Sequence, residues 1–327
     1  MRRLVKEFTS QLTEALEIGK NTNLKAPKNT INNIVITGLG GSGIGGKIAT
    51  QLVADQLKVP AVINNDYSLP KFVNENSLVI VSSFSGNTEE TLEALQSAQE
   101  ANAEIACITA GGKLAQIAND NNYNLLVLPT AFSPRAMLTY SVIQQLFLFD
   151  HYGFINNEFI NDTQETVKLL DAEVNDIMAV AKQTANALFE KTTVAYSEAS
   201  MEGVITRFRQ QINENSKSLA WEHVFPEMNH NELVGWAGGK DEYAVLIFRS
   251  SFEHSRSSVR INISKDIFKK YTSTVLEFNA KGDTLLAQSF YHILLGDWIS
   301  VYLAELNKVD DVEVKVIDFL KAELAKI

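Results

Sequence analysis

The sequence has one cysteine, no long apolar segment and no cluster of basic residues, and each scarcity excludes a class of protein. Cys107 is the single cysteine among 327 residues, which excludes a disulfide framework and a multi-cysteine metal site. No apolar run approaches the ~18 residues that span a bilayer, and the N-terminal residues lack the apolar region of a signal peptide. We therefore expect a cytoplasmic protein that does not insert into membranes.

The charge balance is acidic. The formal net charge is -10 at pH 7, and without a basic cluster this charge argues against nucleic acids and anionic membranes as partners. Such a protein can still bind a phosphate group, through helix dipoles, hydroxyl groups and a few placed cations. The hydrophobic fraction of 45% is ordinary for a globular protein, and the chain is long enough for two packed cores.

Short apolar segments alternate with amphipathic segments in the first half of the chain. The apolar segments predict buried parallel strands at residues 33–37, 61–63, 78–82, 104–109 and 125–128. The intervening segments predict helices at 5–20, 44–57, 89–101 and 113–120, and Pro134 opens a further helix that continues to residue 148. This alternation predicts a doubly wound α/β sheet.

The second half repeats the pattern more loosely. We expect strands at 192–196, 243–248 and 273–278, with helices at 164–189, 202–219, 255–270, 283–306 and 312–326. The polar, asparagine-rich stretch 153–162 marks the best domain boundary. The predicted fold is therefore α/β, with two doubly wound lobes, at 1–153 and 154–327, whose parallel central sheets are flanked by helices.

A glycine-rich turn follows the first predicted strand, at residues 37–43. Glycines allow a close backbone approach to a ligand, and the N-terminus of the next helix favours an anion. Three of these glycines fit G-x-G-x-x-G, and Asp66 stands where a dinucleotide site has its ribose-binding carboxylate. A nucleotide P-loop fits less well, because Ile48 follows Lys47 where a hydroxyl residue should stand.

A hydroxyl-rich loop distinguishes these possibilities. Ser83, Ser85 and Thr88 follow the third predicted strand and precede a helix, so their hydroxyls and the free N–H groups form a phosphate cup. In isolation, one hydroxyl could simply cap the helix. Gly41 and Ser42 of the glycine turn lie on a neighbouring strand end, and the combination favours a phosphomonoester.

Several motifs resemble the sugar isomerase (SIS) domain, and specifically the bifunctional phosphoglucose/phosphomannose isomerase family. The motifs are Gly40-Gly-Ser-Gly43, Ser83-Phe-Ser-Gly-Asn-Thr-Glu-Glu-Thr91, Ser133-Pro-Arg-Ala136, Asn213-Glu-Asn-Ser-Lys217 and Pro226-Glu-Met-Asn-His-Asn-Glu-Leu-Val-Gly-Trp236. The resemblance implies reversible aldose–ketose isomerisation of hexose 6-phosphates through a cis-enediolate, without cofactor or metal. It also implies a homodimer whose active site receives a histidine from the partner subunit.

The resemblance assigns the acid–base roles. Glu214 matches the family's base, and a carboxylate in a partly dry site titrates closer to neutral pH. Histidine is a common general acid and base, so His230 suits ring opening, and the resemblance implies that it is donated by the partner. Without the resemblance, a solvated glutamate on a helix face and a surface histidine would be the ordinary interpretations.

Two cations complete the predicted site. Arg135 follows the fifth strand and would stabilise the enediolate, although a surface salt bridge is the common alternative for an arginine at a helix start. Lys321 matches the family's lysine on the C-terminal helix and would assist ring opening. Lys315 and Lys326 lie on the same predicted helix and stay open as alternatives.

Two other functions stay open at this point. SIS domains also occur in regulatory proteins that bind phosphosugars without catalysis, although the four candidate catalytic residues argue against that function here. A nicotinamide dehydrogenase would use the G-x-G-x-x-G turn, but the hydroxyl-rich loop would then occupy the place of the cofactor contacts.

Overall fold

The computed structural model describes residues 1–130, 133–324 and 326. The chain forms two compact units. The first, called the N-terminal unit here, comprises residues 6–172 and 282–287. The second, called the C-terminal unit, comprises residues 1–5, 173–281 and 288–327.

The N-terminal unit is built on a five-stranded parallel sheet with the order β2-β1-β3-β4-β5. Its strands are β1 (Asn33–Thr37), β2 (Ala61–Asn64), β3 (Ser77–Ser82), β4 (Glu104–Thr109) and β5 (Asn124–Val127). Every residue of β3 and β4 is buried, as expected for strands that helices cover on both faces. Because β1 and β3 are neighbours, the loops that follow them meet at one edge of the sheet.

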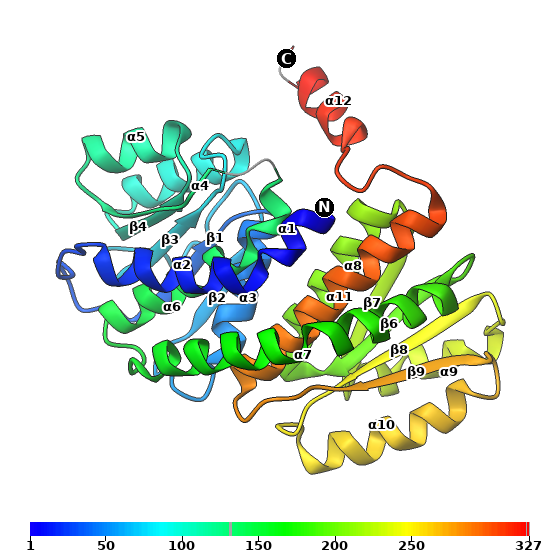
Figure 1. The fold of residues 1–327 in the computed structure, drawn as a ribbon. Helices are drawn as coiled ribbons and strands as arrows, with labels where there is room; N and C mark the ends of the chain where they lie inside the picture. Colours follow the sequence, from blue (N-terminus) through cyan, green and yellow to red (C-terminus); the bar gives the residue numbers. More distant parts are fainter. Residues whose placement is uncertain (131–132, 325, 327) are drawn as a thin grey trace. The chain divides into compact units, whose positions relative to one another are not determined.

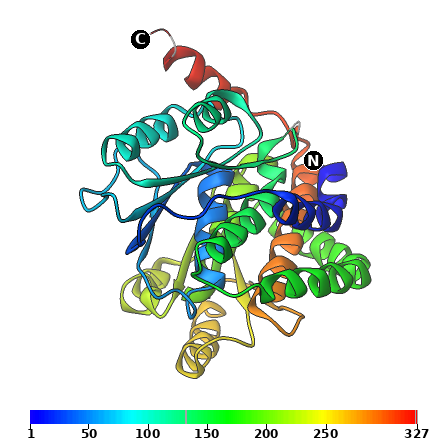
Figure 2. The same ribbon diagram turned by 90° about the vertical axis from the view of Figure 1, so that its left-hand side faces the viewer.

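Helices cover both faces of this sheet (Figures 1 and 2). On one face, α4 (Glu89–Glu100) and α5 (Gly112–Asp120) bury Leu95 and Leu114 against β3 and β4. The other face carries α2 (Phe8–Asn21), α3 (Gly40–Leu52) and α6 (Leu138–His151), and the 3-10 turn η1 (Pro134–Ala136) precedes α6. Helix α3 approaches the sheet closely, since a Cβ on Gly46 would lie 2.7 Å from Cγ2 of Ile36.

The C-terminal unit has a four-stranded parallel sheet with the order β7-β6-β8-β9. Its strands are β6 (Thr192–Glu198), β7 (Ala220–Phe225), β8 (Tyr243–Arg249) and β9 (Thr274–Asn279). Helix α8 (Glu202–Ser216) and helix α11 (Leu285–Asn307) lie on the face to which Phe248 points, because Phe208 and His292 contact its ring.

The opposite face of this sheet is covered by α10 (Ser255–Phe268) and by a short irregular segment. That segment consists of η3 (Glu227–His230), α9 (Glu232–Gly235) and η4 (Trp236–Gly238).

A buried ion pair joins α8 to α11, with Arg207 Nη2 lying 3.2 Å from the Asp297 carboxylate. The remaining elements are α1 (Arg2–Lys6), α7 (Glu158–Leu188), η2 (Ala199–Met201) and α12 (Lys315–Leu324).

The predicted fold class is confirmed, since both sheets are parallel and flanked by helices. Strand β7 was not predicted. Its outward position at the sheet edge gives it a mixed pattern, in which Trp221 and His223 alternate with Glu222. The helix predicted from Pro134 begins instead with the turn η1, and α7 begins earlier than expected, at Glu158.

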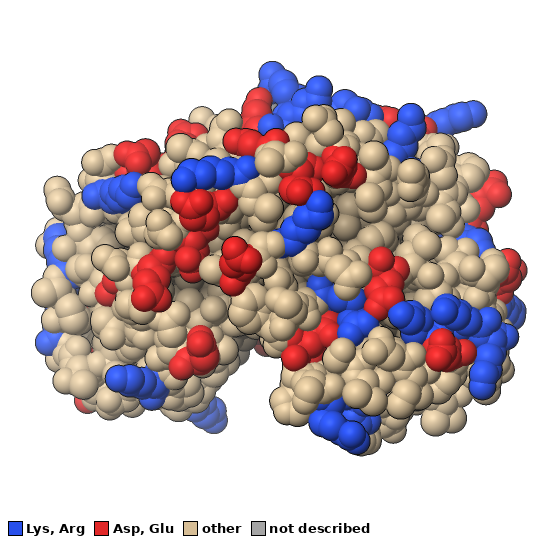
Figure 3. Space-filling view, turned by 60° about the horizontal axis from the view of Figure 1, so that its bottom comes forward, with Lys and Arg blue, Asp and Glu red and all other residues tan. Residues whose placement is uncertain are grey.

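The surface charge is mixed. On the face that Figure 3 shows, basic and acidic side chains are interspersed. Within the part of the chain that the structure describes, no helix combines the length and the apolarity needed to cross a membrane.

Candidate active site

The glycine turn after β1 packs tightly against the end of β3. A Cβ on Gly38 would lie 2.5 Å from the Ser82 carbonyl oxygen, and one on Gly43 would lie 2.4 Å from the Gly38 oxygen. Gly40 has a φ of 53°, which an L side chain rarely adopts. These positions exclude larger residues, so the turn exposes backbone at the start of α3, where an anion is favoured.

Ser42 connects the two predicted loops. Its Oγ accepts a hydrogen bond of 3.2 Å from the backbone N–H of Phe84, in the loop that follows β3. Gly41 lies beside it in the first turn of α3. The glycine turn and the hydroxyl-rich loop therefore form one structure at the carboxyl edge of the sheet, where α/β proteins bind their ligands.

The hydroxyl-rich loop is internally ordered. Ser83 Oγ lies 2.9 Å from Thr88 Oγ1 and accepts a bond of 3.2 Å from the Gly86 N–H. Thr88 is the N-cap residue of α4, yet its side chain makes no capping hydrogen bond. Ser85 is exposed and accepts a bond of 3.3 Å from the Asn87 N–H. The structure thus brings Ser42, Ser83 and Thr88 together, whereas Ser85 faces solvent on the same loop.

Arg135 lies next to the glycine turn. It is buried in η1, and a Cβ added to Gly41 would lie 3.8 Å from the Arg135 Cα. Ser133, two residues earlier, was not assigned a role from the sequence. It is 2% exposed, and its hydroxyl has no hydrogen-bond partner among the described residues. The Ser133-Pro-Arg motif pointed to this segment, but the sequence suggested a role for Arg135 alone.

Asp66, the possible ribose ligand of a dinucleotide site, is exposed after β2. Its Oδ1 accepts a hydrogen bond of 2.7 Å from the neighbouring Tyr67 N–H. The carboxylate is therefore engaged in a local turn, which is an ordinary role for an aspartate in a loop.

Glu214 lies near the C-terminal end of α8, half-buried, and lines a cavity of about 540 Å³. Lys217, which was not predicted to have a role, ends this helix with a φ of 53°. Its ammonium group donates to the carbonyl oxygens of Glu214, Asp310 and Glu313 at 2.7, 2.7 and 2.8 Å. Lys217 therefore ties the end of α8 to the segment that leads into α12.

The start of α12 lines the same cavity. Val316 and Ile317 border it together with Glu214. Lys321 follows Ile317 by four residues, so both lie on one face of the helix. Lys315 pairs with Glu313, and Lys326 pairs with Glu323. Among the described residues, no acidic side chain pairs with Lys321, and the choice of Lys321 over the two alternatives stays a prediction.

Glu214 and His230 lie beyond opposite ends of β7. The strand begins just after Glu214 and its cavity, and it ends at Phe225, shortly before η3 carries the exposed His230. Six residues of strand span ~20 Å. Within one chain the structure therefore does not bring Glu214 and His230 together.

The C-terminal unit has its own serine-rich loop, after β8, at the place that the hydroxyl-rich loop occupies after β3. Ser250, Ser251 and Ser255 line a cavity of about 390 Å³ there. The buried Glu253 carboxylate accepts from the Ser250 N–H at 3.0 Å and from Arg249 Nη2 at 2.8 Å. Hydrogen bonding to this carboxylate raises the pKa of Arg249. The Glu253 carboxylate thus binds the hydrogen-bond donors that a phosphate group would need at this loop.

In the described part of the chain, no group of three His, Cys, Asp or Glu side chains is placed to hold a metal ion.

Residues 29–152 match the family model of the SIS domain. Residues 177–324 match the model of the bacterial phospho-glucose isomerase C-terminal SIS domain.

Similar proteins give the same assignment. The chain is 40% identical to the bifunctional phosphoglucose/phosphomannose isomerase of Caldicellulosiruptor bescii, over 99% of this chain and 98% of that protein. It is 34% identical to the isomerase of that name from Aquifex aeolicus, over 90% of each. The C-terminal domain of glucosamine-fructose-6-phosphate aminotransferase from Francisella tularensis shares the fold, with a TM-score of 0.78 at 13% identity, covering 96% and 98% of the two chains. The chain belongs to the bifunctional phosphoglucose/phosphomannose isomerase family.

Proposed function

We propose that this protein interconverts glucose 6-phosphate and fructose 6-phosphate, and that it also accepts mannose 6-phosphate. The observation that carries this proposal is the joined pair of loops at the carboxyl edge of the first sheet. The Ser42–Phe84 bond unites a glycine turn and a hydroxyl-rich loop, each at a helix N-terminus. Two helix N-termini with hydroxyl donors suit a single phosphomonoester.

We infer that the phosphate is bound by residues of the N-terminal domain, 1–153. Backbone N–H groups at Gly41 and the hydroxyls of Ser42, Ser83, Ser85 and Thr88 would hold it. In the serine-rich loop after β8, the Glu253 carboxylate already accepts hydrogen bonds from the Ser250 N–H and from Arg249. This supports one phosphate site in each chain, in the N-terminal domain. Holding the phosphate at a fixed distance orients C1 and C2 of the open-chain sugar for proton transfer.

The chemistry belongs mainly to the C-terminal domain, 154–327, in this proposal. Glu214 takes the proton from C2 of the aldose, which leaves a cis-enediolate. The O2 proton moves to O1, and Glu214 returns its proton to C1 to form the ketose. Arg135 stabilises the negative charge that develops on the enediolate oxygens. Lys321 and His230 move the proton between ring and hydroxyl oxygens that opens the sugar ring.

We propose that His230 acts in the active site of a partner subunit in a homodimer. The separation of Glu214 and His230 along β7 supports this arrangement. So does Val234, four residues after His230, which is 77% exposed. On α12, none of the ten residues is buried, and Phe319 and Leu320 are 66% and 58% exposed. Large exposed apolar side chains commonly mark protein interfaces.

The proposed reaction is tested with purified protein, glucose 6-phosphate or mannose 6-phosphate, and a coupled assay that detects fructose 6-phosphate. Glu214→Gln keeps the shape of the base and removes its basicity, so we expect kcat to fall about 10²- to 10⁴-fold. Glu202→Gln, at the other end of α8, is the matched control and should keep the wild-type rate. Tight phosphosugar binding without any isomerisation by the wild-type protein would instead indicate a regulatory role.

The donated histidine is tested by mixing two inactive variants, His230→Ala and Glu214→Gln, after dissociation and reassociation of subunits. If the histidine comes from the partner, each mixed dimer has one intact site. Random mixing makes half of the dimers mixed, so about a quarter of the wild-type activity should return. No recovery in verified mixed dimers would show that both residues serve within one chain.

We infer that the enzyme works in the cytoplasm. Hexose 6-phosphates are doubly charged and do not cross an apolar bilayer unaided, so they are found where they are made. Fractionation of cells that express the intact protein tests this inference, and recovery of the protein outside the cytoplasmic fraction would contradict it.

A further inference from the structure

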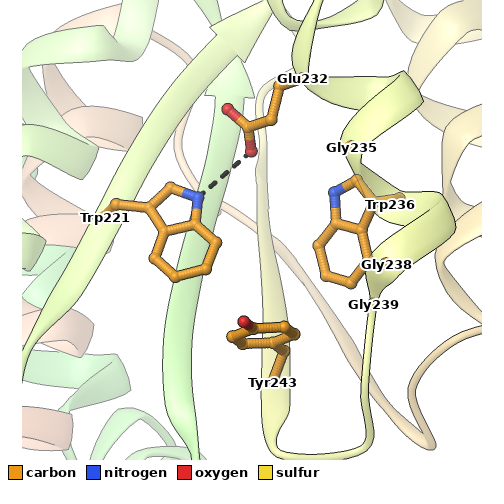
Figure 4. A pocket seen from close by; sticks show the side chains of 7 residues that line it. All are labelled: Trp221, Glu232, Gly235, Trp236, Gly238, Gly239 and Tyr243. Atoms are coloured by element: carbon orange, nitrogen blue, oxygen red, sulfur yellow. Dashed lines mark hydrogen bonds between the residues drawn. The ribbon is translucent and has the colours of Figure 1, made fainter.

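A second cavity lies in the C-terminal unit, on the face of the sheet that α10 covers, and the proposed reaction does not use it. Its volume is about 400 Å³, and it is lined by Trp221, Glu232, Gly235, Trp236, Gly238, Gly239 and Tyr243. Figure 4 shows the two indole rings on either side of the opening, with the Tyr243 ring below them and Glu232 above. We call this group the aromatic cage.

Each indole ring of the aromatic cage stands nearly perpendicular to the Tyr243 ring. Trp221 and Tyr243 have ring centroids 5.4 Å apart with planes at 74°, and Trp236 and Tyr243 have centroids 6.1 Å apart with planes at 79°. The space beside them is open, because a Cβ on Gly235 or Gly238 would meet no atom within 4 Å. A small ligand therefore has room to lie against these rings.

Glu232 places a carboxylate at this cavity. It accepts hydrogen bonds from the Tyr196 hydroxyl, from Trp221 Nε1 at 3.2 Å and from His223 Nδ1 at 2.7 Å. These donors fix the position of the carboxylate beside the rings. None of the residues that line the cavity carries a positive charge.

The aromatic cage is separate from the cavity of Glu214. Glu222 pairs with Arg209 of α8, so its neighbour Trp221 points to the opposite face of the sheet. The sheet therefore stands between the two cavities. The aromatic cage is also unsuited to a sugar phosphate, because Glu232 would repel the anion.

We propose that the aromatic cage binds a small organic ammonium cation. A ring face is negative, so it attracts a cation, and cages of several rings are the usual recognition sites for quaternary ammonium groups. The Glu232 carboxylate, which His223 Nδ1 contacts at 2.7 Å, adds acidic oxygens at the same opening. Both features of the cavity therefore select for positive charge.

Choline is the probe, and 3,3-dimethylbutan-1-ol is its uncharged isostere. Trp221 and Trp236 are two of the chain's three tryptophans, so we expect choline to change tryptophan fluorescence saturably, with a Kd on the order of 1 mM. The isostere should bind at least about tenfold more weakly, because it lacks the cation–π attraction. Equal binding of the two compounds would overturn the proposal, as would the absence of saturation by choline far above this range.

Two variants assign the binding to these residues. Trp221 is 37% exposed, so Trp221→Ala should fold, and it should weaken choline binding about tenfold or more. Glu232→Gln keeps the shape and removes the charge, with a similar loss expected. Wild-type choline affinity in both folded variants, measured by calorimetry, would overturn the proposal.

Competition separates the aromatic cage from the other candidate ligands. Glucose should not displace choline, since an uncharged sugar lacks the attraction to Glu232. Saturating fructose 6-phosphate should not displace choline from the cage, because the Glu232 carboxylate repels a phosphate group. Displacement by either compound would assign the cavity to sugar binding and contradict an ammonium site.

Discussion

Gly86 offers a sharp test of the phosphate loop, because the loop has room only for glycine at this position. Its φ is 67°, and a Cβ would lie 1.8 Å from the Gly111 carbonyl oxygen. Bringing that contact to 3.0 Å, below which real Cβ contacts are essentially absent, requires a shift of 1.2 Å. We expect a shift of this size at Gly86 to break the 3.2 Å bond between the Gly86 N–H and Ser83 Oγ.

The expected effect of Gly86→Ala on substrate binding follows from this displacement. A hydrogen bond to a charged group contributes about 1.5–3 kcal/mol, and 1.4 kcal/mol corresponds to a factor of ten. Loss of one bond to the substrate phosphate should therefore raise KM about ten- to a hundredfold. The left-handed backbone conformation should also cost about 1–2 kcal/mol of stability.

Gly153→Ala is the matched control for this variant. Gly153 has a φ of 75°, and a Cβ there would meet nothing within 4 Å. It belongs to the same unit but lies at the end of α6, away from both loops. It should lose about 1–2 kcal/mol of stability and keep the wild-type KM. A Gly86→Ala enzyme with wild-type KM for glucose 6-phosphate would refute the assignment of this loop to the phosphate.

Two further predictions concern stability. Asp297→Asn leaves the Arg207 charge buried without its carboxylate partner, so urea unfolding should show a free energy of unfolding lower by about 3–5 kcal/mol. Glu305→Gln, in the exposed pair with Arg2, should lower it by about 1 kcal/mol or less. Burial lowers the pKa of His292 to about 4 from its usual 6.5. The unfolded chain therefore binds the extra proton between these values, and the free energy of unfolding should fall as pH drops from about 6.5 to 4. A His292→Gln variant that folds should show a shallower slope.

Much of the fold was predictable from the sequence. The strands of the N-terminal unit contain continuous apolar runs, such as Leu78–Val81 within β3, as expected for strands buried on both faces. Strand β7 escaped prediction because it lies at a sheet edge, where Glu222 reaches Arg209 of α8 while Trp221 lines the aromatic cage. Its residues meet two different environments, so neither a continuous nor a simple alternating apolar pattern results.

The candidate site was predictable in its parts rather than in its arrangement. Ser42 and Ser83 could be linked from the sequence because their loops follow neighbouring strands. The separation of Glu214 from His230 depends on α8 ending at one edge of the sheet and β7 ending at the other. The engagement of Glu253 with the Ser250 N–H depends on the conformation of one loop, which the order of residues does not determine.

The central claim is that Glu214 carries a proton between C1 and C2 through a cis-enediolate. The most direct measurement is isomerisation of glucose 6-phosphate in D2O, with NMR detection of deuterium at C1 of the ketose and C2 of the aldose. The wild-type protein should incorporate solvent deuterium as it reaches equilibrium, and Glu214→Gln should lose both exchange and conversion about 10²- to 10⁴-fold. Full conversion without any deuterium incorporation, or exchange at the wild-type rate in Glu214→Gln, would contradict the claim.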